Sequence, residues 1–393
     1  MNRKISKGNA VEVFLAFLKL GLTSFGGPVA HLGYFRSEFV ERRMWLTDSS
    51  YADIVALCQF LPGPASSQVG IAIGLSRAGY LGALAAWAAF TLPSAVMLIL
   101  FAYGLAFVGG NSSSGWLHGL SVAAVAVVAV AILGMVRTLT PDRMRASVAV
   151  AAMVLAILAP SAWGQIVGIL FGGIVGLVCI KGIQSNDPTV LPLPVNRTVG
   201  VSSLVVFVTL LVGLPLAASM ADNSLIRLFD IFYRVGSLVF GGGHVVLPLL
   251  KAEVVPALVN NDAFLAGYGA AQAVPGPLFT FAAYLGAVIG GWTVAVGCLV
   301  GIFLPSFLLV IGVLPFWDVL RKKPAAQAML AGVNAAVVGL LLAAFYDPVW
   351  TAGITNHFDY ALGLSAFVLL FIWKMPPWLV VILCGVIGQV ALP

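Results

Sequence analysis

The sequence predicts an all-α, polytopic integral membrane protein made of two homologous halves. Hydrophobic residues occupy 61% of its 393 positions and charged residues only 9%, whereas a soluble domain carries about 25% charged residues. Motifs of the first half also return in the second half, in the same order. A duplicated membrane unit with glycine and proline breaks at matching places is typical of secondary transporters.

The duplication rests on paired motifs whose spacing is preserved. The pairs, at offsets of 212 to 215 residues, are Phe-Gly-Gly at 25–27 and 240–242, Gln-x-x-Pro-Gly-Pro at 59–64 and 272–277, and Leu-Pro-Ser at 92–94 and 304–306. Gly119, inside a run of alanine and valine, returns in the same way as Gly332. Because order and spacing both survive, we expect the two halves to share one fold.

Nine apolar stretches are long enough to cross a bilayer, since a spanning helix needs roughly 17–25 residues. They lie at 80–108, 118–138, 144–160, 163–181, 200–220, 290–315, 327–345, 356–373 and 376–393. Four more apolar stretches contain the motif breaks, at 11–33, 50–76, 225–248 and 262–288. We therefore expect roughly nine to thirteen membrane segments, depending on whether the motif segments cross the membrane or re-enter it.

These stretches divide the chain into four parts. The first repeat covers 1–181, a polar, proline-bearing linker 182–199, an extra transmembrane helix 200–220 and the second repeat 221–393. The extra helix has no equivalent in the first half. It adds one membrane crossing between a segment of the first repeat and its copy in the second, so that the number of crossings between them is odd. The second copy is therefore expected to be inserted upside down, as an inverted repeat.

Loop charges predict the orientation. The basic loops 137–147 and 316–326 belong inside by the positive-inside rule, and the N-terminus falls on the same side. Loop 34–49 carries three arginines, and it lies inside only if segments 11–33 and 50–76 re-enter. The charges favour re-entry, although the sequence leaves both arrangements open.

The motif breaks are the candidate substrate site. Paired glycines inside an apolar segment weaken a helix by about 1 kcal/mol each, and Pro-Gly-Pro ends one helix and suits the first turn of the next. Such a helix start presents unpaired N–H groups and a partial positive charge to an anion. A single break would more simply reflect close helix packing or a kink, but matching breaks in both halves favour a site. The candidate residues are Ser24, Gly26, Gly27, Gly63, Ser66 and Ser67 in the first half, and Gly241, Gly242, Gly243, Gly276 and Thr280 in the second.

Two equivalent cations lie within apolar motif segments. Lys19 and Arg234 would attract an anion, because a cation at membrane depth needs a cavity or a partner. The alternative is a structural ion pair. Glu12, seven residues before Lys19, and Asp230, four residues before Arg234, are the carboxylates within reach on the same helices.

Amide and imidazole side chains complete the candidate set. Gln59 and Gln272 precede each Pro-Gly-Pro by three residues, where they can cap freed backbone groups or bind substrate oxygens. His244 follows the second glycine break and His31 lies close to the first, so either is a candidate proton carrier near neutral pH. The alternative for each is a hydrogen-bonded structural histidine.

Other function classes lack their signals. There is no P-loop and no zinc, redox or haem motif, and the four cysteines are widely spaced in apolar segments. We therefore expect no catalytic residue, metal or cofactor. The net charge of +6 is spread over short loops, which suits membrane orientation and not nucleic-acid binding. Carboxylate pairs deep in the membrane, expected of a cation carrier, are also missing, so the sequence favours an anion substrate.

The paired Phe-Gly-Gly and Pro-Gly-Pro motifs resemble the chromate ion transporter (CHR) family in its long-chain, two-domain form. The resemblance covers about residues 11–393. It implies a multi-pass carrier of the bacterial inner (plasma) membrane that exports chromate by antiport or down the membrane potential and so gives chromate resistance. A homodimer is one candidate assembly.

Rival functions remain open at the level of sequence. Chromate and sulfate are both tetrahedral dianions, so helix starts would hardly distinguish them, and a sulfate-type carrier working in uptake is an alternative. An anion channel could be built from the same broken helices. A membrane-embedded enzyme would need a cluster of catalytic side chains at the breaks, and none is visible. We expect alternating access around a site near the middle of the bilayer.

Overall fold

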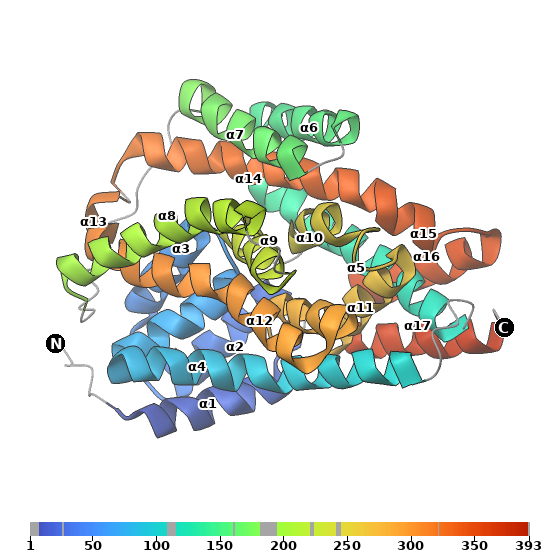
Figure 1. Cartoon of the computed structure of the whole chain (residues 1–393), viewed down its shortest axis with the longest axis horizontal. Helices are drawn as coiled ribbons and strands as arrows, with labels where there is room; N and C mark the ends of the chain where they lie inside the picture. Colours follow the sequence, from blue (N-terminus) through green and yellow to red (C-terminus); the bar gives the residue numbers. More distant parts are fainter. Residues whose placement is uncertain are drawn as a thin grey trace.

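The chain folds entirely into helices within the residues that the computed structural model describes. These residues are 8–25, 27–107, 115–159, 162–180, 195–220, 224–240, 245–320 and 322–391. Most of the expected linker at 182–199 lies outside them. Helix α1 begins near one end of the long axis of the molecule, and α17 ends near the opposite end (Figure 1).

The first half contains seven α-helices and one π-helical segment among the described residues. In chain order they are α1 (Ala10–Thr23), α2 (Gly27–Arg36), η1 (Ser37–Arg42), α3 (Asp48–Phe60), α4 (Ala65–Phe107), α5 (Gly115–Leu139), α6 (Arg143–Leu158) and α7 (Ala162–Cys179). Asn9, Thr47 and Asp142 cap α1, α3 and α6 by accepting a backbone N–H of the first turn. These caps fix where the helices start, because each satisfies a donor that the helix leaves free.

The second half repeats this order after one additional helix, α8 (Arg197–Met220). Its further elements are α9 (Ser224–Leu238), α10 (Val246–Val254), α11 (Asn261–Ala273), η3 (Leu278–Thr280), α12 (Phe281–Val313), η4 (Leu314–Phe316), α13 (Trp317–Leu320), α14 (Pro324–Ala344), η5 (Phe345–Trp350), α15 (Thr351–Gly353), α16 (His357–Phe371) and α17 (Pro377–Ala391). By position in the repeat, α9, α10, α11 and α12 correspond to α1, α2, α3 and α4. Helices α14, α16 and α17 correspond to α5, α6 and α7.

Helices α4 and α12 each turn back on themselves. The backbone leaves helical geometry at Gly79 (φ 66°) and again at Gly291 (φ 81°), two positions that are themselves 212 residues apart. A Cβ atom on Gly74 would overlap the carbonyl oxygen of Gly82, so the two arms of α4 lie in direct backbone contact. Each long helix is therefore a hairpin with one short and one long arm.

The first two motif segments re-enter. The N–H of Gly8 donates to the carbonyl of Arg77 at 3.0 Å, and the Arg77 guanidinium pairs with Glu12 at 3.0 Å. The same guanidinium lies over the ring of Trp45, 4.8 Å from its centroid. The start of α1, the loop before α3 and the turn of the α4 hairpin therefore lie together. Residues 10–36 and 48–77 run inward and return to the same end, which is the arrangement that the loop charges favoured.

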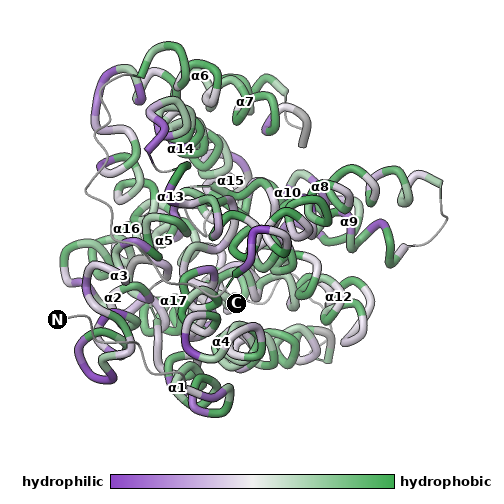
Figure 2. The backbone as a smooth tube through the Cα atoms, turned by 90° about the vertical axis from the view of Figure 1, so that its left-hand side faces the viewer, coloured by the Kyte–Doolittle hydropathy of each residue, from purple (hydrophilic) through white to green (hydrophobic). Residues whose placement is uncertain are grey.

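Several helices have the length and composition of membrane spans. Five described stretches are long and apolar enough to cross, namely Ala65–Leu105, Gly115–Leu139, Arg197–Met220, Leu278–Leu320 and Pro324–Gly353. Three shorter apolar helices follow the same pattern, at Gly164–Cys179, His357–Phe371 and Pro377–Ala391. Most of the chain is hydrophobic, and hydrophilic stretches are short (Figure 2). The surface is apolar as well, as the exposed Leu216 and Val205 of α8 illustrate.

Equivalent helices do not pack equivalently. Among the described residues, α11 packs along both α5 and α17, whereas its counterpart α3 has no comparable packing against α14 or α7. Helix α10 packs against α14 and α7, whereas its counterpart α2 has no comparable packing against α5 or α17. Phe60, at the end of α3, instead faces Trp317, with ring centroids 5.5 Å apart. The two halves therefore share the same order of helices, but equivalent helices have different neighbours in this structure.

Candidate functional site

The motif breaks of opposite halves are hydrogen-bonded to each other. The N–H of Gly63, in the first Pro-Gly-Pro, donates to the carbonyl of Val239 at 2.6 Å. The N–H of Gly276, in the second Pro-Gly-Pro, donates to the carbonyl of Ser24 at 2.9 Å. Ser24 and Val239 are equivalent positions, each two residues before a Gly-Gly pair. The repeat thus makes the same bond twice, each time between the two copies.

The third motif pair meets at the same place. Gly63 and Gly276 have φ angles of 121° and 101°, a region that favours glycine. A Cβ atom on Gly63 would lie 2.7 Å from the hydroxyl of Ser306, and one on Gly276 would lie 2.8 Å from the hydroxyl of Ser94. Both serines belong to the Leu-Pro-Ser motif of the other half. We call this meeting of the three motif pairs the junction.

Buried hydroxyl and amide groups without partners surround the junction. Ser24, Ser67, Gln68 and Ser306 are all at most 2% exposed, and in each of them one side-chain oxygen has no hydrogen-bond partner among the described residues. Gln68 uses its amide nitrogen to bind the carbonyl of Pro62 at 2.6 Å. An unsatisfied buried polar group costs about 1–3 kcal/mol. Four such groups close to two helix starts are the chemistry of a polar ligand site.

The two helix starts are not equal. In α4 the first N–H bonded back to Pro-Gly-Pro is that of Gln68, which donates to Pro64 at 2.9 Å, so the N–H groups of the preceding turn have no partner within the helix. In the second half the chain forms η3, where both the N–H and the hydroxyl of Thr280 bind the carbonyl of Pro277, at 3.0 and 2.8 Å. Free donors are therefore concentrated in the first half.

The two motif glutamines differ as well. Gln59 of α3 is exposed, apart from the buried cluster. Gln272 of α11 is half-buried, and its amide nitrogen is buried beside the hydroxyl of Tyr268, with no hydrogen bond within 3.5 Å to a described residue. Of the two, Gln272 therefore has the donor that a bound oxyanion could use.

The two motif cations are paired with carboxylates. Lys19 lies 3.5 Å from Glu38, while Arg234 contacts Glu253 and also Asp230, the latter at 2.9 Å. Glu38 and Glu253 are separated by the same 215 residues as the two cations, so the ion pair belongs to the repeat. The structural ion pair, the alternative weighed from the sequence, is what the contacts support. Glu12 is not the partner of Lys19, since it binds Arg77.

Several expected site residues lie outside the described part of the chain. They are Gly26, Gly241, Gly242, Gly243 and His244. The other candidate proton carrier, His31, is described and is 1% exposed. Its Nδ1 atom lies 3.3 Å from the hydroxyl of Ser66, in the first turn of α4.

Sequence reasoning passed over four residues that the structure brings to these contacts. Ser94 and Ser306 were used only to align the halves, although hydroxyls inside a repeated apolar motif were a signal. Glu38 and Glu253 were overlooked because each lies after a glycine break in the sequence. Each carboxylate reaches the cation on the helix before the break only because the chain folds back there.

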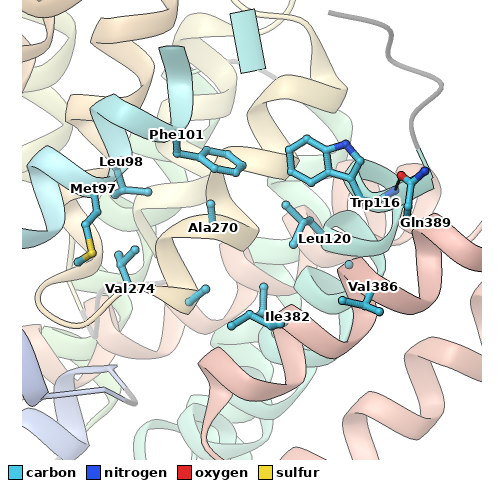
Figure 3. A pocket seen from close by; sticks show the side chains of 13 residues that line it. Met97, Leu98, Phe101, Trp116, Leu120, Ala270, Val274, Ile382, Val386 and Gln389 are labelled. Atoms are coloured by element: carbon cyan, nitrogen blue, oxygen red, sulfur yellow. Dashed lines mark hydrogen bonds between the residues drawn. The ribbon is translucent and has the colours of Figure 1, made fainter. Parts of the chain in front are cut away.

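An apolar pocket of about 490 Å³ lies between α4, α5, α11 and α17. Its wall is almost wholly apolar, with Phe101, Leu120 and Ile382 facing the space (Figure 3). At one end the N–H of Trp116 donates to the side-chain oxygen of Gln389 at 3.3 Å. A dianion entering such a space would lose its hydration without compensation, so this pocket is not the anion site.

Duplicated broken helices whose breaks meet at a buried polar junction are typical of membrane transporters. The sequence comparisons agree with this class. The chain belongs to the chromate transporter family, whose family model matches residues 11–177 and 226–389. It is thus a multi-pass transport protein of the bacterial plasma membrane and not an enzyme.

Named relatives extend over nearly the whole chain. The chromate transport protein of Pseudomonas aeruginosa is 28% identical over 402 residues, covering 97% of this chain and 92% of that protein. The chromate transport protein of Cupriavidus metallidurans is 26% identical, covering 85% and 81%. The probable chromate transport protein of Synechococcus elongatus is 26% identical, covering 95% and 93%. No solved structure matches the chain.

Proposed function

We propose that this chain exports chromate across the plasma membrane and thereby gives resistance to chromate. The observation that carries the proposal is the junction, where the crosswise bonds of Gly63 and Gly276 hold buried, unpartnered hydroxyls against the start of α4. The family and the named relatives point to chromate as the anion.

In this proposal the anion binds mainly to the first half of the junction. The N–H groups of Ser66 and Ser67, at the start of α4, would donate to two chromate oxygens. The hydroxyls of Ser67 and Ser306 are buried without partners and can donate to the others. In the present state the N–H groups of Gly63 and Gly276 are bound across the junction, so these glycines hold the two halves together and do not bind the anion.

The membrane potential would supply the energy for export. Moving one charge through 100 mV is worth about 2.3 kcal/mol, so the outward movement of a dianion through an inside-negative potential is favourable by roughly 4–5 kcal/mol per 100 mV. The paired cations suit this mechanism. Lys19 and Arg234 are each paired with a carboxylate. Their charges are therefore largely neutralised, and the anion can be released quickly.

The asymmetric packing suggests how access alternates. In this proposal five segments cross the membrane between the two copies, namely the long arm of α4 and helices α5, α6, α7 and α8, and an odd number of crossings inverts the second copy. Under this orientation the packed contacts of α11 with α5 and α17 lie toward the outside. Among the described residues, α3 has no comparable packing against α14 and α7, toward the inside. We propose that this state faces the cytoplasm and that exchange of these contacts produces the outward-facing state.

Transport into inside-out vesicles tests the proposal. Vesicles from cells that express the chain are given radiolabelled chromate, with and without an energised membrane. Saturable, energy-dependent accumulation above that of vesicles with an empty vector is expected. If the folded protein is present and no chromate accumulates, the proposal of chromate export is wrong. Competition by excess sulfate measures how selective the site is for chromate. Full competition would favour a sulfate-type carrier. Flux that follows the potential without saturation would instead favour a channel.

A further inference from the structure

One buried polar pair of the first half, His31 and Ser66, can be compared with the equivalent positions of the second half. His31 and Ser66 are in contact in the first half and are 1% and 2% exposed. The equivalent positions in the second half, at the offsets of their motifs, are Val246 and Phe279. Both of these are buried and apolar. The second half therefore has buried apolar residues at both of the equivalent positions.

Keeping a histidine here is unfavourable for folding. The Nε2 atom of His31 is buried and has no hydrogen-bond partner among the described residues, and an unpaired polar atom in the interior is unfavourable. The ring also stands edge-on to Phe90, with centroids 5.2 Å apart. An apolar side chain would fill this space without the cost, as the second half shows at the equivalent positions. We therefore infer that His31 has a functional role and is not simply a packing residue.

The position of His31 indicates that purpose. Its ring faces the backbone of Ser24, whose carbonyl accepts the crosswise bond from Gly276. Its Nδ1 atom contacts Ser66, in the turn proposed to bind the anion. The imidazole thus lies beside the junction on the side with free donors, while one ring nitrogen remains available for a proton.

The charged and titratable groups on the surrounding elements already have their own partners. They are Lys19 of α1 with Glu38, Arg42 and Arg43 around η1, Arg36 with Glu41 and Asp48, Arg77 of α4 with Glu12, Tyr51 of α3 with the carbonyl of Leu32, and Asp53 of α3. No described carboxylate is recorded in contact with His31. The charge that would stabilise a protonated imidazole must therefore come from the bound anion.

We propose that His31 takes up a proton together with the oxyanion, so that proton and anion cross the membrane in the same direction. This inference rests on the proposed anion site. An imidazolium donates Nε2–H to an anion oxygen, and the anion in turn stabilises the imidazolium. By linkage each must raise the affinity for the other by the same factor. The pair carries one net negative charge in place of two, and the potential still favours its exit.

The direction of proton movement tests this inference. Purified protein is reconstituted in liposomes at a pH where chromate is fully a dianion, with the voltage clamped and a pH dye trapped inside. In the wild type we expect protons to move with chromate, and the charge moved per chromate to be about half that of the bare dianion. Proton movement opposite to chromate, or none, would overturn the inference without use of a variant.

Variants locate the proton on the residue. His31→Val places the second-half residue in the first half, so the fold has an internal precedent for it. We expect this variant to transport chromate more slowly, without accompanying protons, and with about twice the charge per chromate. His357→Gln, at an exposed position at the start of α16, should behave as the wild type. Unchanged proton movement in His31→Val would exclude His31, whereas absence of chromate flux in the wild type would instead remove the proposed function.

Discussion

The backbone N–H of Gly63 donates to the carbonyl oxygen of Val239 at 2.6 Å, and this bond joins two motif breaks from opposite halves of the chain. Its repeat counterpart joins Gly276 to Ser24 at 2.9 Å. Because each break is held by the other copy, neither half can form the junction alone. We therefore expect the two breaks to move together during the proposed transport cycle.

Substitution of Gly63 or Gly276 by alanine should abolish chromate transport. The φ angles of 121° and 101° are unfavourable for any residue with a Cβ atom, and such strain costs about 1–3 kcal/mol. The added methyl group would also meet Ser306 or Ser94 at 2.7–2.8 Å. We expect both variants to lose transport in vesicles and to lower the unfolding temperature in detergent.

Glycines in open space on the same hairpin helices provide matched controls. No atom of the described residues lies within 4 Å of a Cβ placed on Gly104 of α4 or Gly297 of α12. Alanine at these positions should leave transport intact and slightly stabilise the helices, since alanine is favoured over glycine by about 1 kcal/mol. Equal loss of transport in the controls would show that helix flexibility, and not the junction, is the cause.

Arg234→Ala should destabilise the fold much more than Lys19→Ala. The Arg234 side chain is 23% exposed and binds two carboxylates, whereas the Lys19 side chain is 54% exposed and lies 3.5 Å from one. Loss of one partner from a buried pair costs about 3–5 kcal/mol, and loss of an exposed pair about 0–1 kcal/mol. Thermal unfolding in detergent measures the difference. Loss of transport in well-folded Lys19→Ala would instead show that Lys19 contacts the anion in another state.

Sequence periodicity predicted individual helices well, because their ends have local causes. Helix α6 (Arg143–Leu158) corresponds to the apolar stretch 144–160, whose start is fixed by the cap at Asp142. The turns of the two hairpins also lie at predicted boundaries. Gly79 falls between the stretches 50–76 and 80–108, and Gly291 lies at the start of the stretch 290–315, which follows 262–288.

The contacts between halves could not be predicted from one sequence. The repeat shows that Ser24 and Val239 are equivalent, but it does not show that each lies against the Pro-Gly-Pro of the other copy. Residues such as Glu38 also depend on the path of the chain after a break. A search along the helix of Lys19 finds Glu12, whereas the partner Glu38 arrives only because α2 folds back beside α1.

Acid should destabilise the protein through Glu38, in the charged segment outside the membrane spans. Burial raises the pKa of this carboxyl, but hydrogen bonds from Arg43 and Arg42 and the charge of Lys19 outweigh burial, so the pKa lies below its ordinary value of 4.5. A carboxyl with a lowered pKa stabilises the fold above its unfolded value, and this contribution is lost as the pH falls through the folded value.

Glu38→Gln should therefore lower the unfolding temperature at neutral pH and make it less dependent on pH below about 4.5. Glu41→Gln, in the same η1 segment but about half exposed, is the matched control and should retain the acid sensitivity of the wild type. An identical acid profile for Glu38→Gln and the wild type would mean that another group governs acid stability.

Cross-linking should trap the asymmetric state. Leu120 of α5 and Ala270 of α11 line the same pocket, on helices that pack in this state. With the four native cysteines replaced by alanine, we expect Leu120→Cys and Ala270→Cys to form a disulfide readily in resting membranes. Chromate transport should then stop and should return after reduction, because the outer contacts of α11 can no longer open.

The repeat also supplies the mirror-image control. Leu57 of α3 and Val333 of α14 are the equivalents of Ala270 and Leu120, on helices without comparable packing. Cysteines at these two positions should cross-link slowly at rest and faster while chromate is being transported, because turnover populates the state in which α3 meets α14. Equally fast cross-linking of both pairs at rest would contradict the exchange of contacts. Continued transport by oxidised protein carrying the first pair would show that α11 does not move from α5 during the cycle.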